Sequence, residues 1–351
     1  MAQNSSCKIT VLITGGGGPG YPLFYKALRD SKVYKIKVVA VDLNKYAGNL
    51  YKKEWVDVAY HVLPNNSPKY FNQILRIIEN ENVDILISAV DEELSLFSKN
   101  RERLKESGCY IVLPPVHALE NSYDKGITYT ILQEKFKMPK TFVYNPGLDM
   151  RKIFDQLDGK VVIKLSRSRG NRFAYIIDNY EELRFYVKKL DKTKKDFLIQ
   201  QYIGGREFNI SLMFDKEGKC IYSICREKMD PPAIRPNTTA GLIRRNKEME
   251  QAAIDATKMM ELFPGTSNVE FLMDKKGGIY LIEINGGRHA AQDMNLIHCG
   301  INIPEMIISM AIGKDVQPID DFQIKEGAFC LKYTDEIIVD FSDVANIVRS
   351  L

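Results

Sequence analysis

Apolar runs and helical patterns alternate through the first third of the chain. The run from Ile9 to Thr14 enters a glycine-rich turn at 15–20, a helical pattern follows, and a second apolar run covers 37–42. Strand, turn, helix and strand in this order are typical of an open parallel sheet. The sequence therefore predicts an N-terminal α/β domain. Its further elements are predicted as a helix at 68–80, a strand at 83–89, a helix at 91–107 and a strand at 110–113.

From Ser122 the pattern changes toward helices mixed with antiparallel strands. Two apolar runs at 208–214 and 220–226 flank a short turn, and an amphipathic helix is predicted near 247–262. This half of the chain is expected to be α+β. Its other predicted elements are strands at 161–165, 174–177, 197–203 and 327–333, and helices at 128–136, 180–190 and 303–312.

Two apolar, β-branched runs at 268–274 and 279–285 flank a Lys-Lys-Gly-Gly turn and predict a hairpin. Glu270, Glu283 and Asn285 are polar residues inside these runs. Glu270 should lie opposite Glu283 or Asn285, and the latter two share a strand face because they are two residues apart. Converging carboxylate and amide oxygens suit a hard cation such as Mg²⁺. The alternative is that these are ordinary polar residues on a solvated sheet face.

Lys164 lies inside the buried-strand pattern 161–165, where a lysine is uncommon unless something anionic meets it. A small, polar and basic loop at 166–172 follows directly, with arginines around Gly170. Flexible backbone with positive charge suits a lid over a polyphosphate. The alternative is a lysine that reaches from an edge strand into solvent.

The glycine-rich turn carries a second nucleotide signal. Gly15, Gly17 and Gly20 match Gly-x-Gly-x-x-Gly, and Asp42 lies where an acid that binds ribose would lie. This pattern predicts a dinucleotide site. The alternative is that the glycines only make a tight strand-to-helix turn and that Asp42 only ends a strand.

Composition narrows the class of protein. A hydrophobic fraction of 45% and a charged fraction of 27% are ordinary for a globular chain, and the net charge of +4 is small. The densest lysine cluster, at 188–195, fits a solvated helix end and loop better than a nucleic-acid surface, because no aromatic platform or binding motif accompanies it. Six cysteines without a Cys-x-x-Cys pair favour a reducing compartment, and the polar first residues are no signal peptide. No apolar run approaches the ~20 residues of a membrane span. We therefore expect a cytoplasmic protein without a membrane partner.

The four histidines show no ligand spacing, so neither a zinc site nor a Ser/His/Asp triad has support. His289 follows the second strand of the hairpin and is a candidate proton-transfer group. The alternative is that it binds substrate or packs against the strand.

Five segments, taken in their order, resemble the ATP-grasp superfamily, and within it the carbamoyl-phosphate-synthase-like and D-alanine–D-alanine-ligase-like carboxylate–amine ligases. The resemblance covers roughly residues 8–315, and the order of the segments carries it more than any one of them. The segments are Tyr123-Asp124-Lys125, Val162-Ile163-Lys164 with its basic loop, the run from Gln200 to Glu207, Asn268-Val269-Glu270-Phe271, and Glu283-Ile284-Asn285.

The resemblance implies a division of the chain into four parts. Residues 1–118 would form a Rossmann-like domain, 119–203 the small lid subdomain of the ATP-grasp fold, and 204–318 its C-terminal subdomain with the metal site. Residues 319–351 would add a strand and a tail. In this family the two α+β subdomains grip ATP, and the glycine turn of the first domain need not bind a dinucleotide.

The resemblance also implies roles for single residues. Glu207 would accept the ribose hydroxyls, while Glu270, Glu283 and Asn285 would hold Mg²⁺, or Mn²⁺ in its place. Arg226 and Arg288 would stabilise charge on the transferred phosphoryl group or on an acyl phosphate. The residues expected near the ATP phosphates are Lys125, Lys164, Ser166, Arg169 and Gly170, and those expected at the adenine hinge are Gln200, Gln201, Tyr202 and Ile203.

Two departures from the family pattern leave two of these roles open. Many relatives have an acid at the hinge, where this chain has Gln200 and Gln201. Relatives often read Glu-x-Asn-Pro-Arg, whereas here two glycines separate Asn285 from Arg288. The hinge residue and the role of Arg288 are therefore open.

The activity implied by the resemblance is an ATP-dependent ligation. A small carboxylate would be joined to an amine or similar nucleophile through an acyl phosphate, with ADP and phosphate as products. Phosphorylation of bicarbonate or carbamate, as in carbamoyl-phosphate synthesis, is the alternative within the family. An NAD-dependent dehydrogenase or a nucleotide-binding module without catalysis are the alternatives outside it. Dimers are common among relatives, which makes a homodimer an open expectation, and the residues name neither substrate.

Overall fold

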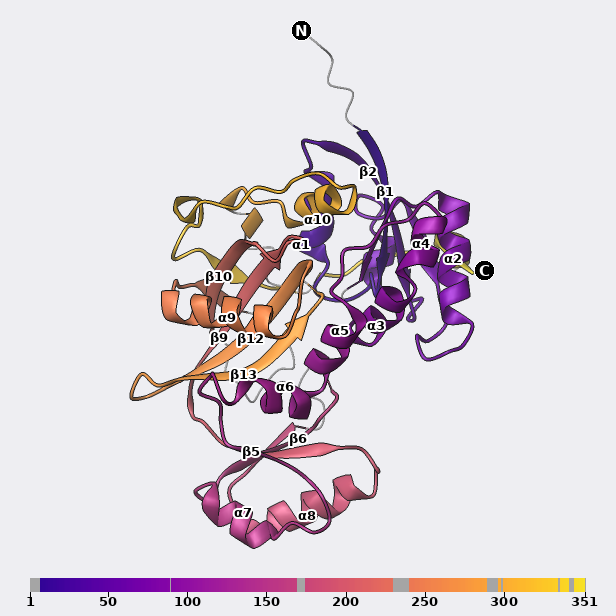
Figure 1. The fold of residues 1–351 in the computed structure, drawn as a ribbon. Coiled ribbons are helices and arrows are strands. Elements are labelled where there is room, and N and C mark those ends of the chain that lie inside the picture. The colour runs from indigo at the N-terminus through magenta and orange to yellow at the C-terminus, as the bar shows by residue number, and fades with distance from the viewer. Residues whose placement is uncertain are drawn as a thin grey trace.

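Three sheets organise the protein in the computed structural model, which describes residues 7–88, 90–168, 174–229, 240–288, 296–297, 299–333, 335–340 and 344–350. Figure 1 shows the first sheet beside a large sheet, with a small sheet and two helices below them. Pairing is parallel in the first sheet and antiparallel in the other two. The predicted fold class, α/β followed by α+β, is confirmed.

The first sheet has the strand order β15-β3-β2-β1-β4. Its central strands are continuous apolar runs because helices bury both faces of a parallel sheet. The strands are β1 (Cys7–Thr14), β2 (Tyr34–Asp42), β3 (Val58–His61), β4 (Ile85–Ser88) and β15 (Val348–Ser350). The helices are α1 (Pro22–Arg29), η1 (Gly48–Tyr51), α2 (Tyr70–Glu81), α3 (Asp91–Lys99) and α4 (Arg101–Glu106).

Two sequence predictions for this domain were wrong. The helix predicted at 91–107 is two helices, because the chain turns at Asn100, whose side chain donates to the Leu96 carbonyl at 2.8 Å. The strand predicted at 110–113 is a single bridge between Tyr110 and Ile85.

At the other end of the chain, β15 pairs with β3 and so completes the first sheet. The boundaries between the four parts stay a prediction.

The small sheet, in the order β5-β8-β6-β7, carries the strand with the buried lysine. Two helices pack their apolar sides on it, and Ile153 and Leu183 from these helices meet Ile163 and Ile199 from the strands. The elements are β5 (Thr141–Val143), α7 (Met150–Gln156), β6 (Val161–Leu165), β7 (Ala174–Ile177), α8 (Tyr180–Asp191) and β8 (Phe197–Gln201).

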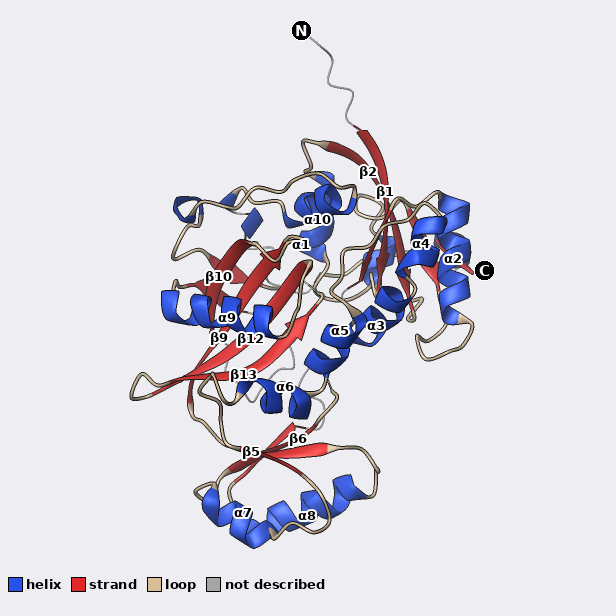
Figure 2. Cartoon of the chain, viewed as in Figure 1, coloured by secondary structure: helices blue, strands red, loops and turns tan. Residues whose placement is uncertain are grey.

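The large sheet, in the order β13-β12-β9-β10-β11-β14, has one apolar face against α9, and its opposite face carries polar residues beside apolar ones. In β9, Phe208, Ile210 and Leu212 pack with helix α9, whereas the intervening Asn209 and Ser211 point to the other face. Figure 2 shows α9 lying across the strands. The elements are β9 (Gly205–Phe214), β10 (Cys220–Lys228), β11 (Ala240–Ile243), α9 (Lys247–Met259), β12 (Gly265–Asp274), β13 (Ile279–Gly286) and β14 (Phe329–Leu331).

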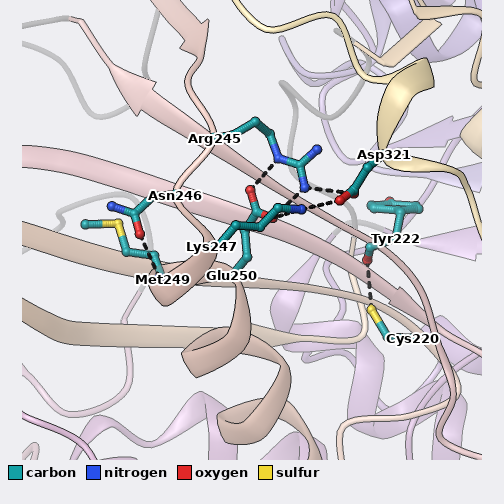
Figure 3. Close-up of polar contacts among 8 residues, drawn as sticks. All are labelled: Cys220, Tyr222, Arg245, Asn246, Lys247, Met249, Glu250 and Asp321. Carbon is teal, nitrogen blue, oxygen red and sulfur yellow. Dashed lines mark hydrogen bonds and ion pairs between the residues drawn. The ribbon is translucent and has the colours of Figure 1, made fainter.

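A cluster of ion pairs fastens the C-terminal segment to the start of α9. Arg245 donates from two nitrogens to Glu250 at 2.6 Å each and from Nη2 to Asp321 at 3.0 Å (Figure 3). Lys247 pairs with the same Asp321. The hydrogen bonds to Glu250 raise the pKa of Arg245, so this guanidinium stays charged.

The remaining helices lie between or beside the three sheets along the chain. In the part of the chain that the structure describes, no helix combines the length and apolar character needed to cross a membrane. The remaining elements are α5 (Val116–Tyr123), α6 (Lys125–Leu132), α10 (Ile303–Ala311), η3 (Asp321–Gln323) and α11 (Val344–Ile347).

Candidate active site

A row of polar residues crosses four strands of the large sheet. Arg226 on β10 pairs with Asn209 on β9, Asn209 with Glu270 on β12, and Glu270 with Glu283 on β13. Directly paired residues share one face, so all four point away from α9. Arg226 Nη2 donates to Asn209 Oδ1 at 2.9 Å. The predicted position of Glu270 opposite Glu283 is thus confirmed, and a bulge follows directly after Glu270.

The next row on this face is held by neutral hydrogen bonds. Ser211, Asn268 and Asn285 pair across β9, β12 and β13. The Ser211 hydroxyl donates to Asn268 Oδ1 at 3.1 Å, and Asn268 Nδ2 donates to the Arg288 carbonyl at 3.0 Å. Asn285 is two residues from Glu283 on β13, so its side chain shares the face that carries both carboxylates.

The row on the other side joins a lysine to two carboxylates. Lys228 pairs with Glu207 in the β10–β9 register. Its Nζ lies 2.9 Å from Glu270 Oε2 and 3.7 Å from Glu207 Oε2. Burial lowers the pKa of Lys228, but the two carboxylates outweigh this and raise it overall, whereas burial raises the pKa of Glu207. Sequence reasoning missed Lys228 because it ended the strand at 226, although its alternation with Arg226 was a signal.

Two more lysines approach the carboxylates from α6 and the small sheet. Lys125 opens α6, lies 3.4 Å from Glu283 Oε1 and donates to the Ser168 carbonyl at 2.7 Å. Lys164 is buried, and burial lowers its pKa to about 8 even though Glu283 opposes the shift. Burial would raise the pKa of Glu283, but Lys125 and Lys164 outweigh it, so this carboxylate stays ionised.

Asp124 ties the start of α6 to the predicted lid loop. Its Oδ1 accepts from the Gly126 N–H at 3.0 Å as the N-cap of the helix, and from the Ser166 hydroxyl at 2.5 Å. Its Oδ2 accepts from Arg167 Nε at 2.9 Å. Asp124 therefore sets the position of Lys125, its chain neighbour, against the loop. Arg169, Gly170 and His289, which the sequence singled out, lie outside the described residues.

The predicted adenine hinge follows β8. The Gln200 side chain is buried and donates to Thr141 Oγ1 at 2.8 Å, so it acts inside the small sheet. The backbone N–H groups of Gln201 and Tyr202 donate to the carbonyls of residues 140 and 160 at 2.8 and 3.2 Å. Among the described residues, the Ile203 N–H has no such acceptor. Of the four hinge residues, Ile203 is thus the one whose backbone can donate to a base.

The two predicted arginines have different surroundings. Arg226 lies buried in the polar row, whereas Arg288 follows β13 and its Nε lies 2.5 Å from Asp91 Oδ1. Asp91 begins α3 of the first domain. The first domain therefore contributes a carboxylate beside the candidate site, which sequence reasoning missed because no local pattern links the two segments.

The glycine turn uses its own polar groups internally. The N–H groups of Gly16, Gly17 and Gly18 donate to the Val41 carbonyl, to Asp42 Oδ2 and to the Gly15 carbonyl at 2.9–3.0 Å. Asp42 Oδ1 accepts a further backbone N–H at 2.7 Å. The groups that a dinucleotide would need are already bonded, so this geometry favours a structural turn over a dinucleotide site.

The donor set fits a hard cation that is completed by ligands from outside the protein. Within the described ranges, no group of three or more His, Cys, Asp or Glu side chains could hold a metal. Glu270 and Glu283 supply two carboxylates with Asn285 beside them, and each carboxylate lies against a lysine ammonium. Negative charge at this point therefore already pairs with positive charge. Two carboxylates with an amide suit Mg²⁺ bound together with substrate phosphates.

Comparison with protein families identifies the fold that holds this site. Residues 122–289 match the description "ATP-grasp domain", and residues 11–112 match "PylC-like, N-terminal domain". The first match includes the site residues Lys125, Lys164, Glu207, Arg226, Lys228, Glu270, Glu283 and Arg288, whereas Asp91 falls in the second match. Residues 122–289 belong to the ATP-grasp superfamily. The resemblance drawn from the five ordered segments is thereby confirmed.

Two curated proteins are similar to different lengths of this chain. A D-alanine–D-alanine ligase of Petrotoga mobilis is 33% identical over 96 residues, 27% of this chain and 30% of the relative. The large chain of a Campylobacter jejuni carbamoyl phosphate synthase is 22% identical over 334 residues, 88% of this chain and 30% of the relative. The chain thus spans about a third of the length of these two relatives.

Solved structures share the fold at low sequence identity. A Campylobacter jejuni biotin carboxylase, solved with a β,γ-ATP ligand, superposes with a TM-score of 0.72 at 17% identity, covering 91% of this chain and 74% of that one. An L-amino acid ligase of Bacillus licheniformis gives 0.65 at 17% identity, covering 90% and 76%. These similarities confirm the ATP-grasp fold after a parallel-sheet domain.

Proposed function

We propose that this protein is an ATP-dependent ligase that joins a small-molecule carboxylate to an amine or similar nucleophile and releases ADP and phosphate. The observation that carries the proposal is the convergence of Lys125, Lys164 and Lys228 on Glu270 and Glu283 inside an ATP-grasp domain. A polyphosphate with a divalent cation matches this mixture of charges. The names of the relatives and structural neighbours, which include amino-acid ligases, agree with it.

Each part of the site has a proposed task. Glu270, Glu283 and Asn285 would hold Mg²⁺, or Mn²⁺ in its place, and the ion would neutralise and orient the phosphates of ATP. Lys125 and Lys164 would neutralise phosphate oxygens, with the loop beginning at Ser166 closing over them. Glu207 would accept the ribose hydroxyls. In the hinge from Gln200 to Ile203, the base would bind mainly to backbone groups.

The proposed chemistry has two displacements. A carboxylate oxygen of the substrate attacks the γ-phosphorus, the bond from that phosphorus to the bridging oxygen breaks, and ADP leaves. The amine nitrogen then attacks the acyl carbon of the acyl phosphate, phosphate leaves, and the amine loses a proton to water. Arg226 and Arg288 would stabilise the charge on the transferred group, and positioning supplies most of the acceleration.

Phosphate release tests this proposal. Purified protein is given Mg²⁺ and ATP with a panel of amino acids and small carboxylates, with bicarbonate as a separate arm for the carbamoyl-phosphate alternative. We expect release with one acid and amine pair, and loss of about 100-fold or more in Glu283→Ala. Glu217→Ala, which removes an exposed carboxylate from a turn, is the control and should stay active.

Other outcomes separate the alternatives. Nucleotide binding without release under any condition would favour a binding module without catalysis. Quenching of NADH fluorescence by the protein would favour the dehydrogenase. No binding of ATP would overturn the proposal altogether. Light scattering in the same buffer tests whether the protein is a homodimer. We include this test because one structural neighbour is described as a biotin carboxylase domain dimer.

A further inference from the structure

We propose that Lys228 acts as an internal counter-cation that makes metal binding at this site depend on nucleotide. The inference rests on the proposed nucleotide and metal site and adds a determinant to it. In the free protein the ammonium of Lys228 would occupy the carboxylate oxygens that a metal needs. Metal ions alone would therefore bind weakly, and the metal would enter together with the polyphosphate.

The contacts of Lys228 are those of a resident cation. Its side chain is 16% exposed, and Nζ bridges Glu270 Oε2 at 2.9 Å and Glu207 Oε2 at 3.7 Å. The three residues lie on adjacent strands β10, β9 and β12, whose backbone pairing keeps them together. A dication that binds Glu270 has to take an oxygen away from this ammonium.

The charge balance of the site points the same way. The described carboxylates at its centre are Glu207, Glu270 and Glu283. The described cations around them include the ammonium groups of Lys125, Lys164 and Lys228 and the guanidinium of Arg226. Negative charge is already matched without a metal, so a dication alone would enter a site with no excess of negative charge. A polyphosphate carries the missing negative charge, and it gives the lysines another partner.

Lys228 differs from the other two lysines in what it can release. Lys125 also donates to the Ser168 carbonyl at 2.7 Å, and Lys164, on β6 of the small sheet, is buried. Within the described residues, the polar contacts of Lys228 Nζ are with the two carboxylates only. Of the three lysines, Lys228 is the one whose substitution would free an oxygen of Glu270 and keep the hydrogen bond from Lys125 to the predicted lid loop.

Metal binding to the free protein tests the inference directly. Free Mn²⁺ is followed by electron paramagnetic resonance in the presence of the full chain without nucleotide. Lys228→Met should bind Mn²⁺ about tenfold or more tightly than the wild type, and Lys228→Arg, which keeps the charge, should stay close to the wild type. Lys228→Gln repeats the test with a polar side chain in case the methionine variant does not fold.

A matched control removes an ammonium from another carboxylate. Lys37 Nζ on β2 lies 2.8 Å from Glu81 Oε2 at the end of α2, so Lys37→Met breaks a similar pair outside the site and should leave Mn²⁺ affinity unchanged. A gain in Lys37→Met equal to that in Lys228→Met would show that lost positive charge acts generally and would overturn the inference. Unchanged Mn²⁺ affinity in folded Lys228→Met and Lys228→Gln would overturn it as well.

A second arm separates this inference from the proposed function. A fluorescent ADP analogue is titrated into the wild type with and without Mg²⁺. If it binds but Lys228 variants gain no affinity for the metal alone, the counter-cation role fails and the nucleotide site stands. If it does not bind under either condition, the proposed function itself fails.

Discussion

The glycine turn of the first domain and the hairpin of the large sheet both carry sequence signals for a nucleotide, but their polar groups have different partners in the structure. In the turn, backbone N–H groups and the Asp42 carboxylate bond to each other at fixed distances. In the hairpin, Glu270 and Glu283 pair with the ammonium groups of lysines from other elements, Lys228 on β10 and Lys125 on α6. Polar groups that bond within their own turn satisfy the backbone there, whereas ion pairs between side chains of separate elements mark the hairpin as the candidate binding site.

The largest expected effect is on the hairpin side of this comparison. Lys164→Met should weaken binding of a fluorescent ATP analogue about 10- to 100-fold, because a buried ammonium that meets phosphate is lost. The melting temperature should not fall, since the variant no longer buries a charge whose pKa burial lowers to about 8. Lys152→Met, on the exposed side of α7, is the control. Equal affinity in both variants would remove Lys164 from the nucleotide site.

Gly17→Ala tests the other side. An added Cβ would lie 2.1 Å from the Ala47 Cβ and 2.9 Å from Asp42 Oδ2, so the turn has to shift. We expect a loss of about 1–3 kcal/mol in the free energy of unfolding, measured with urea, and unchanged nucleotide affinity. Gly48→Ala, whose nearest heavy atom would be 3.7 Å away, should be nearly neutral. Nucleotide affinity lost in folded Gly17→Ala would show that the turn takes part in binding after all.

Asp91→Asn asks whether the first domain reaches the site. Its carboxylate lies 2.5 Å from Arg288 Nε, so the variant leaves this guanidinium less well positioned. We expect kcat to fall about tenfold with little change in the KM for ATP, since the proposed role of Arg288 is in the transition state. Glu102→Gln on α4 serves as the control. A change in KM for ATP alone would instead place Arg288 in ground-state binding.

The smallest expected effect is a pH dependence in the first domain. Glu93 is buried at the ends of β1 and β4, and burial raises its pKa although hydroxyls of Thr14, Tyr70 and Ser88 oppose the shift. The folded state then holds this proton more tightly than the unfolded chain does. Its stabilising contribution is therefore present at pH below 4.5 and is lost as pH rises through the raised pKa.

Glu93→Gln removes this titration. Relative to the variant, the wild type should lose free energy of unfolding between pH 4.5 and 7.5 in urea titrations. Parallel curves for the two proteins across that range would contradict the assignment. Because Glu93 lies on the glycine-turn side, nucleotide affinity at pH 7.5 should be the same in both.

Much of the candidate site could be predicted from local pattern. The alternation of β12 and β13 around a glycine turn set Glu270 opposite Glu283, because a short turn leaves few registers. Lys164 could be predicted as a site residue because a lysine inside an apolar strand is uncommon unless an anionic group meets it. The predictions of one helix at 91–107 and of a strand at 110–113 were wrong. The spacing of apolar residues shows neither the turn at Asn100, whose side chain donates to the Leu96 carbonyl, nor that Tyr110 forms only a single bridge with Ile85.

The sequence by itself determined which face of each element is polar, because side chains repeat with the period of the backbone. Only the tertiary structure decided which polar faces meet. The order β12-β9-β10 brings Lys228 to Glu270, and the packing of α3 near the end of β13 brings Asp91 to Arg288. Such contacts depend on the order of the strands and on the packing of the domains. Both involve apolar residues that are far apart in the sequence, so no single stretch encodes them.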